Sequence, residues 1–98
     1  MDGNTHSLVE KLHEAISSED KKKVVEELES ILAVLQTKNP ELASVIIHPP
    51  VITELHNRLV EVFQVPRRAM MLRNRVPGRD SRAILFTKAM LNGMKRVM

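Results

Sequence analysis

The sequence predicts an all-α protein, a compact bundle of five or six short helices in a single domain of residues 1–98. Apolar residues recur at spacings of three and four through most of the chain. No segment has the two-residue alternation of a half-buried strand. Ninety-eight residues, 43% of them hydrophobic, are enough for one such domain. Residues 1–6 are polar, and we expect them to be a frayed lead.

Capping residues mark where the first three helices begin. Ser7 and Glu10 form a capping box in front of the first apolar residues. Residues 17–20 interrupt that helix and cap the second, and Asn39 with Pro40 caps and starts the third. The second helix has one wholly apolar face, which consists of Val24, Leu28, Ile31 and Leu35.

Residues 51–65 form the stretch on which we expect the rest of the bundle to depend. One apolar stripe runs along it, made up of Val51, Ile52, Leu55, Leu59, Val62 and Phe63. Pro66 disfavours a helical backbone at Val65 and should end this helix. Phe63 and Val65 then flank a helix end, where an apolar side chain can stay exposed and contact a partner. In the alternative interpretation, Phe63 seals the core.

The last third of the chain leaves structural alternatives open. Residues 66–77 are either a short helix or an irregular arm, because their apolar residues fit a helical face but a Pro-Gly pair follows closely. Asp80 or Ser81 is expected to cap a final helix. We expect a monomer, and a homo-oligomer paired through residues 70–72 is the alternative.

Charge divides the chain into two parts of opposite sign. Up to Val65, six bases against eleven acids give a net charge of −5, whereas from Pro66 onward nine bases against Asp80 alone give +8. Such a division indicates either internal complementarity or a positive face for an anionic partner. Seven of the nine bases are arginines, which favours the second interpretation because arginine binds carboxylate and phosphate in fixed geometry.

The residue types argue against catalysis and metal binding. There is no cysteine, so neither a disulfide framework nor a thiolate zinc site is available. No two of the four histidines have the i,i+3 or i,i+4 spacing that would place them together on a helix. No phosphate-binding loop or nucleophile motif is present, and no apolar run is long enough for a membrane span. We therefore expect no enzyme activity, no metal and no cofactor.

Nucleic-acid binding is the alternative function that the basic segment suggests. Its arginines could neutralise phosphates: Arg67, Arg68, Arg73, Arg75, Arg79 and Arg82. However, Phe63 and Phe86 are the only aromatic residues, and single-stranded nucleic acid is usually held by stacking on several aromatic rings. We therefore expect auxiliary contact with nucleic acid rather than dedicated sequence readout.

Several strings of the sequence resemble one family of helical domains. The resemblance begins at Ile16 and continues through four strings: EELESILAVLQT at 26–37, HPPVITEL at 48–55, FQV at 63–65 and KAML at 88–91. Together they resemble the integrase-binding domains of lens epithelium-derived growth factor and its hepatoma-derived growth factor relatives. Those domains are related to the N-terminal domain of transcription elongation factor TFIIS. The resemblance implies a compact right-handed helical bundle that acts in the nucleus.

The resemblance also implies a function and a site. In that family, two interhelical loops form a shallow apolar notch that accepts a hydrophobic residue from disordered acidic segments of transcription and chromatin proteins. The matching notch residues here are Ile16, Phe63 and Val65. Ser17 stands where the family has an aspartate that accepts backbone hydrogen bonds from the partner. The family's bases precede the phenylalanine, whereas here Arg67 and Arg68 follow it as the expected positive rim.

Overall fold

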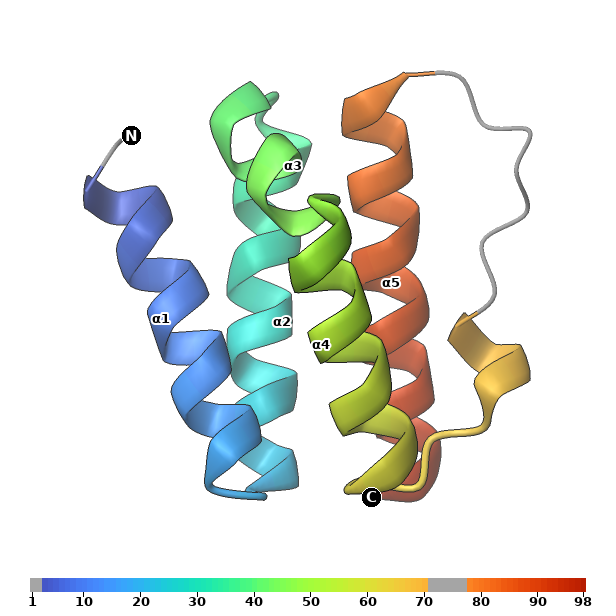
Figure 1. The fold of residues 1–98 in the computed structure, drawn as a ribbon. Coiled ribbons are helices and arrows are strands. Elements are labelled where there is room, and N and C mark those ends of the chain that lie inside the picture. The colour runs from blue at the N-terminus through green and yellow to red at the C-terminus, as the bar shows by residue number, and fades with distance from the viewer. Residues whose placement is uncertain (1–2, 71–77) are drawn as a thin grey trace.

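The chain folds into short helices joined by tight connections (Figure 1). The computed structural model describes residues 3–70 and 78–98. Its elements are α1 (Gly3–Ser17), α2 (Lys21–Gln36), α3 (Pro40–Ile46), α4 (Pro49–Glu61), the 3₁₀ helix η1 (Arg67–Met70) and α5 (Arg79–Val97). None of the described residues lies in a strand, so the prediction of an all-α helical bundle is confirmed.

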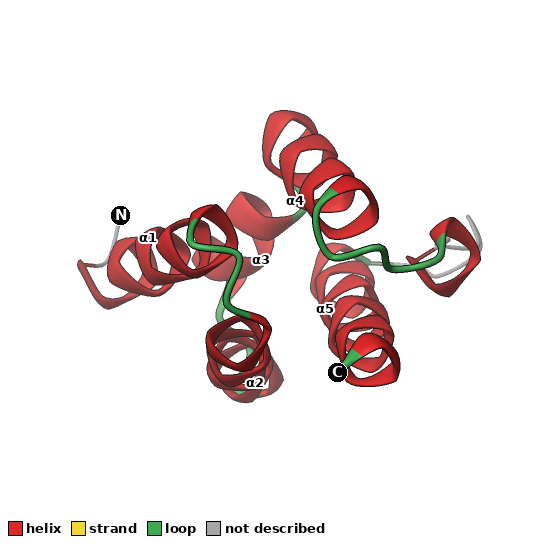
Figure 2. Ribbon diagram, turned by 90° about the horizontal axis from the view of Figure 1, so that it is seen from below, coloured by secondary structure: helices red, strands yellow, loops and turns green. Residues whose placement is uncertain are grey.

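Helices α2 and α5 make the most extensive packing contacts in the bundle. α2 packs against both α1 and α5, and α5 also contacts α3 and η1. In the view along the bundle, α1, α2 and their connection lie on one side, and α4 and α5 lie next to each other on the other side (Figure 2). The α1–α2 connection, the end of α4 and the C-terminus all lie at the lower end in Figure 1. The Cα radius of gyration is 12.2 Å, as expected for a compact domain of about 100 residues.

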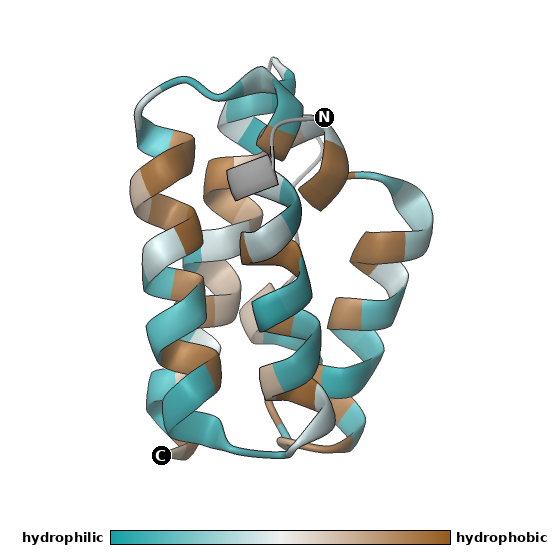
Figure 3. Ribbon diagram, turned by 90° about the vertical axis from the view of Figure 1, so that its left-hand side faces the viewer, coloured by the Kyte–Doolittle hydropathy of each residue, from teal (hydrophilic) through white to brown (hydrophobic). Residues whose placement is uncertain are grey.

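Every α-helix contributes to a single apolar core. Hydrophobic and hydrophilic bands alternate along the helices (Figure 3), as the sequence periodicity predicts. The predicted apolar face of α2 is buried along its whole length. The residues of the core with no exposed surface are Leu12, Val24, Leu28, Ile31, Leu42, Ala43, Ile46, Leu55, Leu59, Ala83, Met90 and Met94.

Two of the predicted capping residues act as predicted. The carboxylate of Asp20 accepts hydrogen bonds from the backbone N–H groups of Lys22 and Lys23, at 3.1 and 3.3 Å. The side-chain oxygen of Asn39 accepts the backbone N–H of Leu42 at 2.9 Å, and Pro40 occupies the first turn of α3. These bonds satisfy amide groups that have no partner within the helix.

The start of α1 differs from the sequence prediction. Of the expected frayed lead, residues 1–2 lie outside the described range, and residues 3–6 form the first turn of α1. Ser7 is therefore inside the helix and does not cap it. The physical reason is a tertiary contact: Thr5 is only 1% exposed, and its hydroxyl accepts a hydrogen bond from Asn39 Nδ2 at 3.5 Å.

The ends of the later helices also differ. α4 ends at Glu61, two residues before Phe63, rather than between Phe63 and Val65 as expected. Neither Asp80 nor Ser81 caps α5, because the N-cap is Gly78, whose φ of 91° is accessible to glycine at little steric cost. Within 66–77, the described part contains the 3₁₀ helix η1, and residues 71–77 lie outside the described range.

We predict that Asn39→Ala lowers the free energy of unfolding by about 1 kcal/mol, the usual effect of losing a capping side chain. Chemical denaturation monitored by circular dichroism measures this change. Asn39→Asp is the matched variant, because it keeps the acceptor for Leu42 and loses only the donor to Thr5. We expect Asn39→Asp to retain most of the stability. Equal losses in both variants would show that the Thr5 contact, not the cap, carries the effect.

Candidate functional site

All three predicted apolar notch residues are part of the hydrophobic core. Ile16 is near the end of α1, and Phe63 and Val65 are in the connection between α4 and η1. Their exposed fractions are 3%, 2% and 1%, respectively. Ser17, the last residue of α1, is exposed beside them. The apolar notch residues are therefore part of the core in this conformation, which favours the interpretation that Phe63 seals the core.

The backbone after α4 explains why these side chains point inward. Gln64 adopts a left-handed φ of 60°, and the chain reverses there. The amide of Phe63 donates to Arg58 O at 3.3 Å, and the amide of Val65 donates to Leu59 O at 2.9 Å. Gln64 is exposed while Phe63 and Val65 on either side of it are buried. The turn thus directs both apolar side chains into the core.

Val65 is held against α5 at a glycine. A β-carbon placed on Gly93 would lie 2.5 Å from Val65 Cγ1 and 3.7 Å from the β-carbon of Ala69. The first distance is far too short for two carbon atoms, so the valine methyl fills the space that a larger residue at position 93 would need. A glycine weakens a helix relative to alanine, but at position 93 it also permits this close approach.

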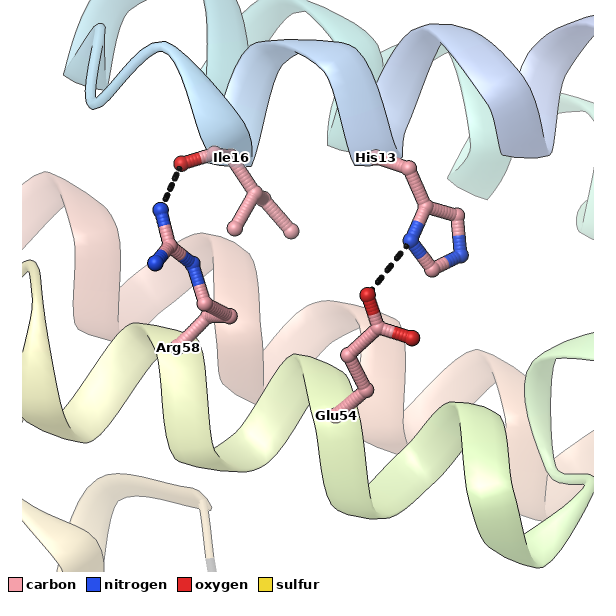
Figure 4. Close-up of polar contacts among 4 residues, drawn as sticks. All are labelled: His13, Ile16, Glu54 and Arg58. Carbon is pink, nitrogen blue, oxygen red and sulfur yellow. Dashed lines mark hydrogen bonds and ion pairs between the residues drawn. The ribbon is translucent and has the colours of Figure 1, made fainter.

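Polar side chains join α1 to α4 across this end of the molecule (Figure 4). Arg58 Nη2 donates a hydrogen bond of 2.7 Å to the backbone carbonyl of Ile16, and the Ile16 side chain projects from α1 toward α4. One helical turn away on each helix, His13 Nδ1 and Glu54 Oε1 are 3.0 Å apart. Arg58 therefore satisfies a carbonyl group at the C-terminal end of α1, where a positive charge is favourable.

A lysine makes an equivalent contact with the end of α5. Lys21 Nζ donates a hydrogen bond of 3.0 Å to the backbone carbonyl of Val97. The contact gives one of the three lysines at the start of α2 a structural role, although cations at a helix N-terminus are mildly disfavoured. Two cationic side chains, Lys21 and Arg58, thus bind the C-terminal carbonyl groups of the first and last helices.

The predicted basic residues do not form one continuous patch in the described parts of the chain. Arg67 and Arg68 are exposed on η1, beside the lower half of α5 in Figure 1. Arg79 and Arg82 lie at the opposite end of α5, where Arg79 Nη1 donates to the hydroxyl of Ser44 at 2.9 Å. Two further members of the predicted set, Arg73 and Arg75, lie outside the described residues.

The exposed bases next to η1 are not neutralised by described residues. The side-chain pairs at ion-pair distance between described residues are His6–Glu10 and His13–Glu54, which involve no lysine or arginine. Arg67 and Arg68 therefore form no ion pair within residues 3–70 and 78–98.

Within the described residues, no group of three or more metal-ligating side chains could hold a metal ion. No helix among them is long and apolar enough to cross a membrane.

Sequence reasoning missed Arg58 and Gly93 as determinants of this region. In the sequence, Arg58 is only one of the six bases in the acidic part of the chain, and its contact with α1 was not predicted. It lies five residues before Phe63, close to the turn that follows α4. A glycine inside a helical pattern is itself a signal of close approach by another segment. The approaching segment, Val65, cannot be identified from sequence because it is 28 positions away.

We predict that Phe63→Ala lowers the free energy of unfolding by about 3 to 5 kcal/mol, since removing a buried ring leaves a cavity. Urea denaturation measures the change. Phe63→Leu is the conservative comparison and should lose much less, because it retains most of the apolar volume. A loss below about 1 kcal/mol for Phe63→Ala would contradict burial and would restore Phe63 as an exposed contact.

We predict that Arg58→Met lowers the free energy of unfolding by about 1 to 2 kcal/mol. The methionine keeps an apolar stem but loses the charged hydrogen bond to Ile16 O, and such bonds contribute roughly 1.5 to 3 kcal/mol when buried. Arg58→Lys should retain part of the stability because it keeps a donor. Thermal denaturation measures both variants, and equal stability of Arg58→Met and the original chain would rule out a role for this bond.

No protein-family model, no curated protein and no solved structure matches this chain. The family resemblance drawn from the short strings of the sequence therefore stays a prediction. The function has to be inferred from the packing, exposure and charge of the chain's own residues.

Proposed function

We propose that this chain is a non-catalytic interaction domain that binds disordered, acidic segments of transcription or chromatin proteins through a hydrophobic anchor residue. The observation that carries the proposal is the pair of exposed bases on η1, Arg67 and Arg68, which form no ion pair with a described residue. We call this pair the bases around η1. A nuclear location is part of the proposal and rests on the family resemblance alone.

The charge of the partner follows from the charge of this surface. Exposed bases attract an acidic segment and accelerate its encounter with the domain, although each exposed ion pair adds only about 0.2 to 1 kcal/mol. The anchor supplies the rest, because burying one aliphatic or aromatic side chain contributes about 1.5 to 3 kcal/mol. Ordering a disordered peptide opposes binding by several kcal/mol. Affinity in the micromolar range is therefore expected.

The notch at Ile16, Phe63 and Val65 requires a rearrangement before it can take the anchor. All three side chains are buried, and Arg58 bonds to the carbonyl of Ile16 at the same end of the bundle. An anchor could enter only by displacing packed side chains. The proposed function therefore depends on the exposed bases and not on an open notch.

Nucleic-acid binding through residues 67–82 is the second candidate function, and the exposed arginines are the observation that favours it. The positions of the arginines are less favourable for binding one nucleic acid. η1, which carries Arg67 and Arg68, lies beside the lower half of α5 in Figure 1, whereas Arg79 and Arg82 are in the first turn of α5 at its upper end. Contacts with many phosphates would also weaken steeply with salt, roughly in proportion to the number of phosphates neutralised. Binding that depends on an apolar anchor should be less sensitive to salt.

We predict that the chain captures a defined set of acidic proteins from nuclease-treated nuclear extract, and that Arg67→Glu/Arg68→Glu captures much less of them. Both residues are exposed, so the variant should keep the helicity and melting temperature of the original chain. Quantitative mass spectrometry of the captured proteins measures the effect.

The matched control is Lys22→Glu/Lys23→Glu, which reverses two adjacent exposed bases at the start of α2. We expect it to capture the same proteins as the original chain. Capture that disappears after nuclease treatment would support the nucleic-acid alternative. Equal loss in the two charge-reversed variants would show that only net charge matters, and would overturn the proposed role of the bases around η1.

A further inference from the structure

A groove lies between η1 and the C-terminal half of α5. Its volume is about 400 Å³, within the roughly 300 to 1,000 Å³ typical of ligand pockets. One face of α5 and one residue of η1 supply apolar atoms, from Ala69, Leu85, Ala89 and Gly93. We call these four residues the floor. Lys88, Asn92 and Arg96 line the same groove on α5, and we call them the rim.

The groove exists because small residues meet where a helix and a connection pack together. Leu85, Ala89 and Gly93 follow at four-residue intervals and so share one face of α5. Ala89 and Ala69 leave space that leucine or methionine would fill, whereas Val65 fills the space at Gly93. Leu85 is 39% exposed, and apart from Met98 it is the only large hydrophobic residue exposed in the described parts of the chain. Ala69 and Ala89 are half-buried and Gly93 is buried. The accessible apolar surface of the floor therefore comes from Leu85 and the two alanines.

The rim supplies two positive charges at a defined separation. Lys88 and Arg96 are both exposed, and the side chain of neither forms an ion pair or a hydrogen bond with another described residue. They are eight residues apart on α5, which corresponds to about 12 Å along the helix axis. An extended peptide advances about 13 Å over four residues and directs alternate side chains to the same side.

We propose that this groove is the docking site for an extended segment with the pattern acidic–x–hydrophobic–x–acidic. The two acidic residues would meet Lys88 and Arg96, and the hydrophobic residue between them would lie beside Asn92, on the floor between Ala89 and Gly93. This assignment rests on the proposed function and gives it a site that is open in the structure, unlike the buried notch. Charge complementarity selects an acidic peptide, and the floor supplies the apolar contact that a phosphate backbone would not use.

The test uses the full chain and two fluorescein-labelled peptides of about nine residues. Each contains two glutamates, one leucine and otherwise serine and glycine. In the first peptide the glutamates flank the leucine in the proposed pattern, and in the second they are adjacent at one end. Fluorescence anisotropy measures binding to the original chain, to Lys88→Glu/Arg96→Glu, to Leu85→Ser and to the control Lys11→Glu/Lys22→Glu, which reverses two exposed bases outside the groove.

We expect the patterned peptide to bind the original chain at least about tenfold more tightly than it binds Lys88→Glu/Arg96→Glu, and several-fold more tightly than the peptide with adjacent glutamates. Leu85→Ser should weaken binding, and the control should change it less than twofold. Circular dichroism checks that each variant has the same helicity, since all of the charged positions are exposed.

The outcomes separate this inference from the function on which it rests. Equal binding of the patterned peptide to the original chain and to Lys88→Glu/Arg96→Glu overturns the groove and leaves the proposed function standing. Equal binding of the two peptides overturns the extended pattern. If neither peptide binds the original chain at millimolar concentration, both the groove and the proposed function are overturned.

Discussion

The contact between Val65 and Gly93 determines how the connection after α4 meets the last helix. The Val65 methyl occupies the position next to Gly93 where any side chain would stand, and Val65 is 1% exposed as a result. Because this contact holds the connection on α5, η1 packs along the same helix. The absence of a β-carbon at position 93 therefore permits both the burial of Val65 and the close approach of η1 to α5 beside the groove.

A helix end does not by itself make an apolar residue available to a partner. After α4, the left-handed backbone of Gln64 and the bond from Val65 N–H to Leu59 O reverse the chain over the core. Phe63 and Val65 consequently both point inward. Arg58 adds to this arrangement by binding the end of α1, so displacing Ile16 would also disturb a charged hydrogen bond. The end of the bundle that resembles a binding site is thus one of its more tightly bonded regions.

Local signals in the sequence were sufficient for most of the helices, and tertiary contacts account for the rest. The apolar period of α2 and the caps Asp20 and Asn39 act over a few residues, so they could be predicted. The early start of α1 could not, because Thr5 is held by Asn39, which is distant in sequence. The same limit applies to the site. The positive charge was evident from composition, whereas the groove needs Ala69 to meet α5, and that contact depends on the fold.

The division of charge and the small residues of α5 have separate consequences for binding. Exposed bases attract many anions, including nucleic acid, and so they set the rate of encounter more than the identity of the partner. An apolar floor between two bases discriminates further, because only a segment with a hydrophobic residue between its acids gains from both. The small side chain of Ala89 leaves accessible apolar surface on α5 beside unpaired bases, whereas the space at Gly93 is filled by Val65. Selectivity in this molecule therefore derives from where side-chain volume is missing as much as from where charge is present.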